Sequence, residues 1–132
     1  PETKISEIKA AGDSAFRCGK YEEAILHYSK AISLDSKSAV LYSNRSAAFL
    51  KNSQCQKALE DANICIGLGS MGAKGLSRRA AAFQSLKMYA QAATEWRQIL
   101  ESEPGHAAAT KGLKDCDASL KRHLSYGDPF TK

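Results

Sequence analysis

The chain has 132 residues, of which 43% are hydrophobic and 25% charged, and its formal net charge is +5. This length fits a single domain, and the composition is ordinary for a globular protein. The charge favours acidic partners, but basic and acidic residues are interspersed and form no long run, so nucleic acid is not the expected partner. No apolar run approaches ~18 residues, so no membrane-spanning segment is expected.

The cysteines argue against a metal site. Cys18, Cys55, Cys65 and Cys116 show neither a CxxC motif nor the cysteine–histidine spacing of zinc sites. We therefore expect no metal or other cofactor, and reduced, mostly buried thiols in a cytoplasmic protein. No signal peptide opens the chain, and it begins at Pro1 rather than at methionine, so we expect a fragment of a longer protein.

The sequence repeats itself at an interval of 34 residues. One position of the repeat always holds a small residue and another always holds alanine, and aromatic residues recur at further shared positions. The aligned sets are Gly12, Ser46 and Ala80; Ala24, Ala58 and Ala92; Phe49 and Phe83; Tyr21 and Tyr89; Tyr28 and Trp96. So many matches at one fixed period are typical of a repeat architecture.

Each copy contains two amphipathic stretches. Apolar and small residues from Ile8 to Phe16 follow helical spacing, Gly19 and Lys20 interrupt it, and a second helical pattern runs from Tyr21 to Ile32. The small residues at the shared positions allow the two helices of a copy to approach closely. The same scheme recurs over residues 38–67 and 72–102, so each copy is predicted to be a helical hairpin.

The region after the third copy is predicted to close the stack. Pro104 and Gly105 end that copy, and His106 to about Leu124 form one more helix with an apolar side and a basic side, as an end cap requires. We expect residues 125–132 to be an extended or disordered tail, in which Asp128-Pro129-Phe130 resembles a short docking peptide but is better explained as a tail remnant.

This pattern resembles the tetratricopeptide repeat family over residues 4–124. The resemblance implies one all-α domain over residues 1–132. It is a right-handed superhelix of three helix-turn-helix hairpins, about 4–37, 38–71 and 72–105, followed by the capping helix 106–124. In such a stack the first helix of each hairpin lines the concave face. Trp96 belongs to a second helix, so we expect it in the core.

The concave face is predicted to carry cations and an amide. Lys9 and Asp13 lie four residues apart on the first such helix, as do Lys74 and Arg78 on the third, and this spacing places each pair on one face. Asn44 lies exactly one repeat before Arg78. Cations and an amide that converge in this way would bind carboxylates through charge-assisted hydrogen bonds.

These positions resemble the carboxylate clamp of the Hsp-organising co-chaperone family. The resemblance implies a binding site formed by Lys9, Asp13, Asn44, Lys74 and Arg78. It implies as partner the acidic C-terminal peptide, ending in Glu-Glu-Val-Asp, of heat-shock protein 90 or 70. Phe16, Arg17, Leu50 and Lys51 are further candidates for the groove wall, where they would widen the positive groove or contact an apolar ligand side chain.

Asp13 departs from the family pattern, which has asparagine there. An ionised aspartate accepts hydrogen bonds but does not donate them, and at about 4 Å from a ligand carboxylate it would cost roughly 1–4 kcal/mol. Asp13 would therefore weaken the clamp, redirect it to another partner, or pair with Lys9.

Catalysis is not expected, because no histidine, cysteine, serine or carboxylate constellation and no phosphate-binding loop can be recognised. Two alternatives remain: a scaffold that binds an internal segment of a partner, and a regulatory module of a larger phosphatase or peptidyl-prolyl isomerase. As a fragment the domain is expected to be monomeric.

Overall fold

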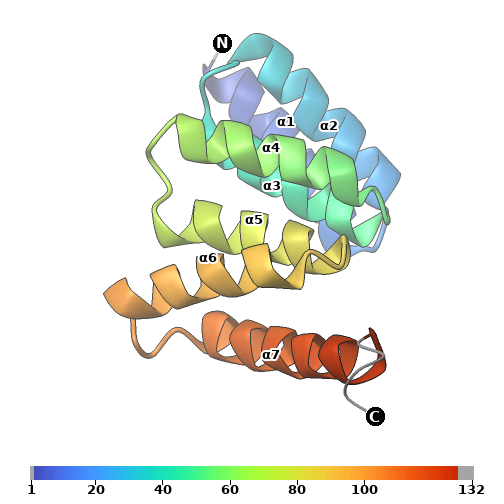
Figure 1. The fold of residues 1–132 in the computed structure, drawn as a ribbon. Coiled ribbons are helices and arrows are strands. Elements are labelled where there is room, and N and C mark those ends of the chain that lie inside the picture. Colours follow the sequence, from blue (N-terminus) through green and yellow to red (C-terminus); the bar gives the residue numbers. More distant parts are fainter. Residues whose placement is uncertain (1, 128–132) are drawn as a thin grey trace.

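The computed structural model describes residues 2–127, and within them it contains helices and no strand. The helices stack in chain order from one end of the molecule to the other (Figure 1), which confirms the all-α prediction. Their bounds are α1 Glu2–Arg17, α2 Tyr21–Leu34, α3 Ala39–Lys51, α4 Cys55–Gly67, α5 Ala73–Ser85, α6 Tyr89–Ser102 and α7 Ala107–Gly127.

The same tight turn closes each hairpin. Gly19, Ser53 and Lys87 lie one repeat apart and all have positive φ, at 77°, 61° and 63°. The residue after each of them donates its backbone N–H to a carbonyl five residues earlier, as Lys20 does to Ala15 at 2.9 Å. This bonding satisfies carbonyls that the end of a helix leaves free. Glycine adopts the left-handed conformation readily, so Gly19 suits its turn better than serine or lysine suit theirs.

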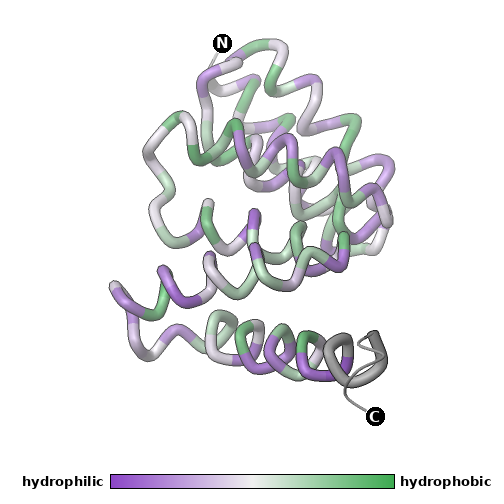
Figure 2. The backbone as a smooth tube through the Cα atoms, viewed as in Figure 1, coloured by the Kyte–Doolittle hydropathy of each residue, from purple (hydrophilic) through white to green (hydrophobic). Residues whose placement is uncertain are grey.

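The two helices of a hairpin touch through small residues. Gly12, Ser46 and Ala80 are all buried, and a Cβ atom added at Gly12 would come within 2.9 Å of the Tyr28 ring. Ala24, Ala58 and Ala92 on the second helices are fully buried. Hydrophobic and hydrophilic residues alternate along each helix (Figure 2), as expected of helices that bury one side.

One arginine connects the second hairpin to the first, and an equivalent arginine connects the third hairpin to the second. Arg45 on α3 donates two hydrogen bonds to Asp61 on α4, at 2.7 and 2.8 Å, and a third to Ser29 on α2 at 3.1 Å. One repeat later, Arg79 on α5 pairs with Glu95 on α6 at 2.7 Å and reaches Asn63 on α4 at 3.2 Å. Because each guanidinium binds groups on two second helices, it fixes how consecutive hairpins sit against each other.

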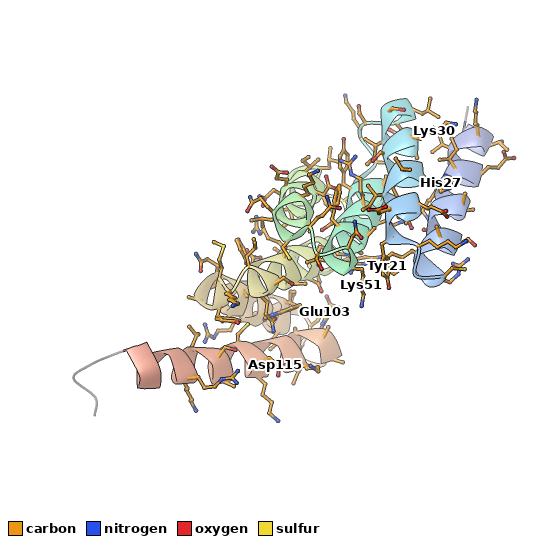
Figure 3. The ribbon with its side chains drawn as sticks, turned by 90° about the vertical axis from the view of Figure 1, so that its right-hand side faces the viewer. Tyr21, His27, Lys30, Lys51, Glu103 and Asp115 are labelled. Carbon is orange, nitrogen blue, oxygen red and sulfur yellow. The ribbon has the colours of Figure 1, made fainter. Side chains whose placement is uncertain are left out.

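The last helix, α7, packs mainly on α6. Gly112 of α7 lies against the Trp96 ring, so closely that a Cβ atom there would be 2.3 Å from the nearest ring atom. Trp96 is buried, as predicted, and its indole N–H donates to the Gln84 side chain at 3.1 Å. The side view separates α2, which carries Lys30, from α7, which carries Asp115, at opposite ends of the stack (Figure 3).

Two expectations from the sequence were wrong. Helix α7 runs to Gly127, so residues 125–127 are helical rather than part of a tail, because no helix breaker occurs between Leu124 and Gly127. The remaining tail, including Asp128-Pro129-Phe130, lies outside the described residues. The cysteines are also less buried than expected. Cys65 and Cys116 are buried, but Cys18 is exposed and Cys55 is half-buried.

No helix in the described part of the chain is long and apolar enough to cross a membrane. Residues 2–127 also hold no group of three or more histidine, cysteine or acidic side chains that could bind a metal ion.

Gly112→Ala is expected to destabilise the fold by about 1–3 kcal/mol, because the new methyl group would collide with the indole of Trp96 and overpack the α6–α7 contact. Gly67→Ala is the matched control, since no atom lies within 4 Å of a Cβ added at this helical glycine. Urea unfolding followed by Trp96 fluorescence measures both variants, and equal stabilities would show that α7 does not depend on this contact.

Candidate functional site

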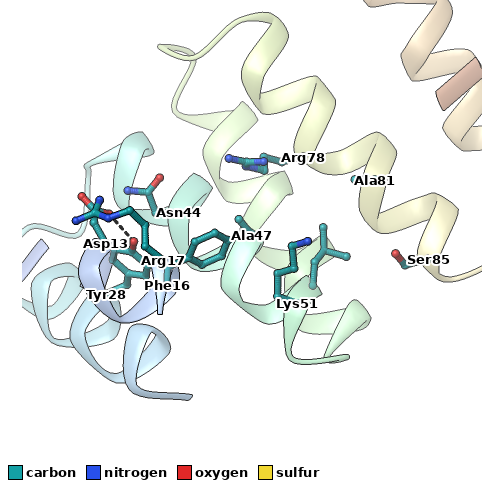
Figure 4. Close-up of a pocket in the computed structure, with 11 residues that line it drawn as sticks. Asp13, Phe16, Arg17, Tyr28, Asn44, Ala47, Lys51, Arg78, Ala81 and Ser85 are labelled. Atoms are coloured by element: carbon teal, nitrogen blue, oxygen red, sulfur yellow. Dashed lines mark hydrogen bonds between the residues drawn. The ribbon is translucent and has the colours of Figure 1, made fainter. Parts of the chain in front are cut away.

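A pocket of about 600 Å³ opens on the face shared by α1, α3 and α5. It brings together every groove residue predicted from the sequence except Lys9 and Lys74 (Figure 4). The lining residues are Asp13, Phe16, Arg17, Tyr28, Asn44, Ala47, Leu50, Lys51, Arg78, Ala81 and Ser85. Tyr28 is the one that comes from a second helix, α2.

The lining residues form rows that cross the helices in register. Asn44 and Arg78 are one repeat apart and form one row. Asp13, Ala47 and Ala81 form a second row, and Arg17, Lys51 and Ser85 form a third. The 34-residue period therefore places equivalent positions of α1, α3 and α5 in the same pocket.

Asp13 is bound on both sides by its own chain. The ammonium group of Lys9 donates to Asp13 Oδ2 at 2.9 Å, and the hydroxyl of Tyr28 donates to Asp13 Oδ1 in a short hydrogen bond. Partial burial opposes ionisation of Asp13, but the bonds from Tyr28 and Lys9 outweigh it and lower the pKa of the carboxyl group. Asp13 is therefore ionised at neutral pH, and Lys9 already has a counter-ion.

Within residues 2–127, the other clamp candidates have no acidic partner. Arg78 donates a long hydrogen bond, 3.3 Å, to the hydroxyl of buried Ser43, and burial lowers the pKa of its guanidinium. Lys74, one turn earlier on α5, is exposed. Among the residues that the structure describes, neither forms an ion pair. A guanidinium that is partly desolvated and lacks a counter-ion favours binding of an anion.

Four lining residues, Tyr28, Ala47, Ala81 and Ser85, were not among the groove residues predicted from the sequence. The repeat period leads from Asp13 to Ala47. Ala81 and Ser85 lie one repeat after Ala47 and Lys51, so extending those rows by 34 residues leads to them. From the sequence, Tyr28 was identified only as an aromatic repeat position aligned with Trp96. Its ring is buried against Gly12, but its hydroxyl reaches the pocket and holds Asp13.

Comparison with known proteins identifies the architecture. Residues 12–53 match the family model described as TPR repeat. The first TPR domain of Spaghetti (RPAP3), solved with the HSP90 peptide SRMEEVD, is 31% identical with a TM-score of 0.85, and the match covers 92% of this chain and 96% of that one. The chain belongs to the tetratricopeptide repeat family.

Longer TPR proteins are also similar. Mouse mitochondrial import receptor subunit TOM34 is 32% identical over 128 residues, which are 91% of this chain and 41% of TOM34. The Hsp70-Hsp90 organizing protein of Triticum aestivum is 41% identical over 109 residues, which are 83% of this chain and 19% of the wheat protein. The chain thus spans less than half the length of these curated relatives.

Tyr28→Phe is expected to raise the pKa of Asp13, because the hydroxyl that stabilises its ionised form is lost. It should also cost about 1.5–3 kcal/mol of stability, the range for a hydrogen bond to a charged group. Since the bond lowers the pKa of Asp13, this stability is fully present above the ordinary aspartate value and is lost as pH falls through the lowered pKa.

The matched control is Tyr42→Phe, because the buried Tyr42 hydroxyl donates to an uncharged acceptor, the Ser36 carbonyl, at 3.0 Å. Urea unfolding between pH 2 and pH 7 and an NMR titration of the Asp13 carboxyl carbon measure both effects. If the loss of stability caused by Tyr28→Phe varies with pH no more than the loss caused by Tyr42→Phe, then the Tyr28 hydroxyl does not stabilise the ionised Asp13.

Proposed function

We propose that the groove binds the acidic C-terminal peptide of a heat-shock protein 90 or 70 chaperone, and that the chain is the interaction module of a co-chaperone or adaptor. The observation that carries this proposal is the row of Asn44 and Arg78, which lines the pocket without an acidic partner, next to exposed Lys74. An amide and two cations in this arrangement satisfy a carboxylate with charge-assisted hydrogen bonds.

The comparisons support the same ligand class. The RPAP3 domain binds an HSP90 peptide that ends in Glu-Glu-Val-Asp, and the wheat relative is named as an organiser of Hsp70 and Hsp90. We infer a non-catalytic, cytoplasmic module whose binding site comprises Lys9, Asp13, Asn44, Lys74 and Arg78. The repeats proposed at residues 4–37, 38–71 and 72–105 supply these residues, and Phe16, Arg17, Leu50 and Lys51 extend the groove.

One observation favours a second candidate, the binding of an internal acidic segment. Asp13 presents a carboxylate where the family has an amide, and it holds Lys9 in an ion pair. A terminal carboxylate placed there competes with Asp13 for Lys9, whereas a backbone N–H of a continuing chain donates to Asp13. Titration with a Glu-Glu-Val-Asp peptide and its C-terminally amidated form distinguishes the two, because the second candidate predicts no loss on amidation.

Arg78→Ala and Lys74→Ala are each expected to weaken binding of SRMEEVD by about 2 kcal/mol or more, because a charged hydrogen-bond partner of the ligand is removed. Isothermal titration calorimetry measures the affinity, and circular dichroism checks that the fold is unchanged. Lys30→Ala is the control, since Lys30 is exposed on α2 outside the pocket. Native folding with unchanged affinity in both groove variants would exclude this groove as the site.

Peptide affinity is also expected to fall with salt, because opposite charges drive the encounter and the Debye length shrinks from about 10 Å at 0.1 M to about 3 Å at 1 M ionic strength. Titrations across this range measure the effect. An affinity that stays constant would instead indicate that apolar contacts, and not charges, hold the peptide.

Asp13→Asn is expected to tighten binding of the acidic peptide. The change removes a negative charge beside the ligand, adds an N–H donor and releases Lys9 from its ion pair. Calorimetry of both proteins with the same peptide measures the difference. Weaker binding by the variant would instead mean that Asp13 selects a ligand with a donor group at this place.

A further inference from the structure

The row formed by Arg17, Lys51 and Ser85 has no role in the clamp described above. These residues hold the same repeat position on α1, α3 and α5, and all three are exposed and line the pocket that contains Arg78. No ion pair of Arg17 or Lys51 occurs among the contacts of the described residues. An anion bound between two like charges on neighbouring helices attracts both of them and so offsets their repulsion.

The charge pairing along α1 explains why this row is available for a ligand. On α1 the clamp lysine, Lys9, is paired with Asp13, so the charges of these two residues cancel. Arg17 follows Asp13 by four residues on the same helix and lies close enough for its charge to lower the Asp13 pKa, after the effects of burial, Tyr28 and Lys9. Arg17 is therefore the cation without a hydrogen-bonded counter-ion that α1 contributes to the pocket.

The groove thus has two cationic centres, one at Asn44, Lys74 and Arg78 and the other at Arg17 and Lys51. On α3, Lys51 follows Asn44 by seven residues, which corresponds to ~10 Å along a helix. On α3 and α5 the surface between the centres is small and apolar, because Ala47 and Ala81 lie in the middle row with Phe16 and Leu50 beside it. On α1 the middle row holds Asp13, whose charge is paired with Lys9. Figure 4 shows Phe16 and Ala47 between Asn44 and Lys51.

We propose that Arg17 and Lys51, with the Ser85 hydroxyl as an additional donor, form a second anion subsite that binds an acidic side chain three residues before the ligand's last acidic residue. This inference rests on the proposed function. Three residues of a polyproline II chain span ~9 Å and bring side chains i and i+3 to the same side of the peptide. The apolar side chain between them then faces Phe16 and Leu50.

A double-mutant cycle tests the subsite. The probes are SRMEEVD and two variants of it, each with one of the two glutamates replaced by glutamine. The proteins are the natural domain and its Arg17→Gln and Lys51→Gln variants. Each protein variant is expected to bind SRMEEVD about two- to five-fold more weakly, the scale of an exposed ion pair. The loss should vanish with the peptide that lacks the glutamate three residues before the terminal aspartate, and persist with the other.

Lys30→Gln is the matched control, and its affinity for all three peptides should stay within about two-fold of the natural domain. The subsite is overturned if the variants lose the same affinity for every peptide, if they lose none, or if their loss depends on the other glutamate. If binding still depends on Arg78 in these cases, the proposed function is unaffected. If the natural domain fails to bind SRMEEVD, or Arg78→Ala has no effect, the proposed function fails and the subsite fails with it.

Discussion

The structure depends on the close contact between the two helices of each hairpin. Gly12 leaves space for the ring of Tyr28, and Ser46 and Ala80 keep the same position small and buried in the next two hairpins. Because this contact recurs every 34 residues, the first helices stand side by side in the same register. Each pocket row therefore consists of residues one repeat apart, and the chemistry of a row is set by single substitutions that leave the packing unchanged.

Substitutions within the pocket rows place positive and negative charges at different positions. In the middle row Asp13 is followed by two alanines, so one carboxylate lies among several cations instead of in a ring of acids. Tyr28 ties that carboxylate to the core contact at Gly12, because the same side chain packs on the glycine and donates to Asp13. The carboxylate is thereby fixed where it neutralises Lys9, and the cations that remain for a ligand are those of α3 and α5 together with Arg17.

Most of the fold and of the pocket could be predicted from sequence, because both follow the 34-residue period. Asn44 and Arg78 were predicted side by side for this reason, and they line one pocket. Features that depend on side-chain direction could not be predicted. The sequence showed Lys9 and Asp13 four residues apart but not that Tyr28 binds the second carboxylate oxygen, nor that Lys74 lies outside the pocket. Periodicity likewise does not reveal how much of Cys18 or Cys55 its neighbours cover.

The pocket does not continue onto α7, because α7 uses the equivalent positions for packing and for solvation. The residue of α7 that continues the row of Asn44 and Arg78 is Gly112, which lies against Trp96 and so presents no side chain to a ligand. The residue that continues the small positions Gly12, Ser46 and Ala80 is Lys114, which is exposed. A lysine cannot allow the close approach that glycine, serine and alanine allow, so α7 does not serve as the first helix of another hairpin with this geometry. The groove row of Asn44 and Arg78 therefore has no polar side chain on α7, and the small packing position of the three hairpins is occupied there by an exposed lysine.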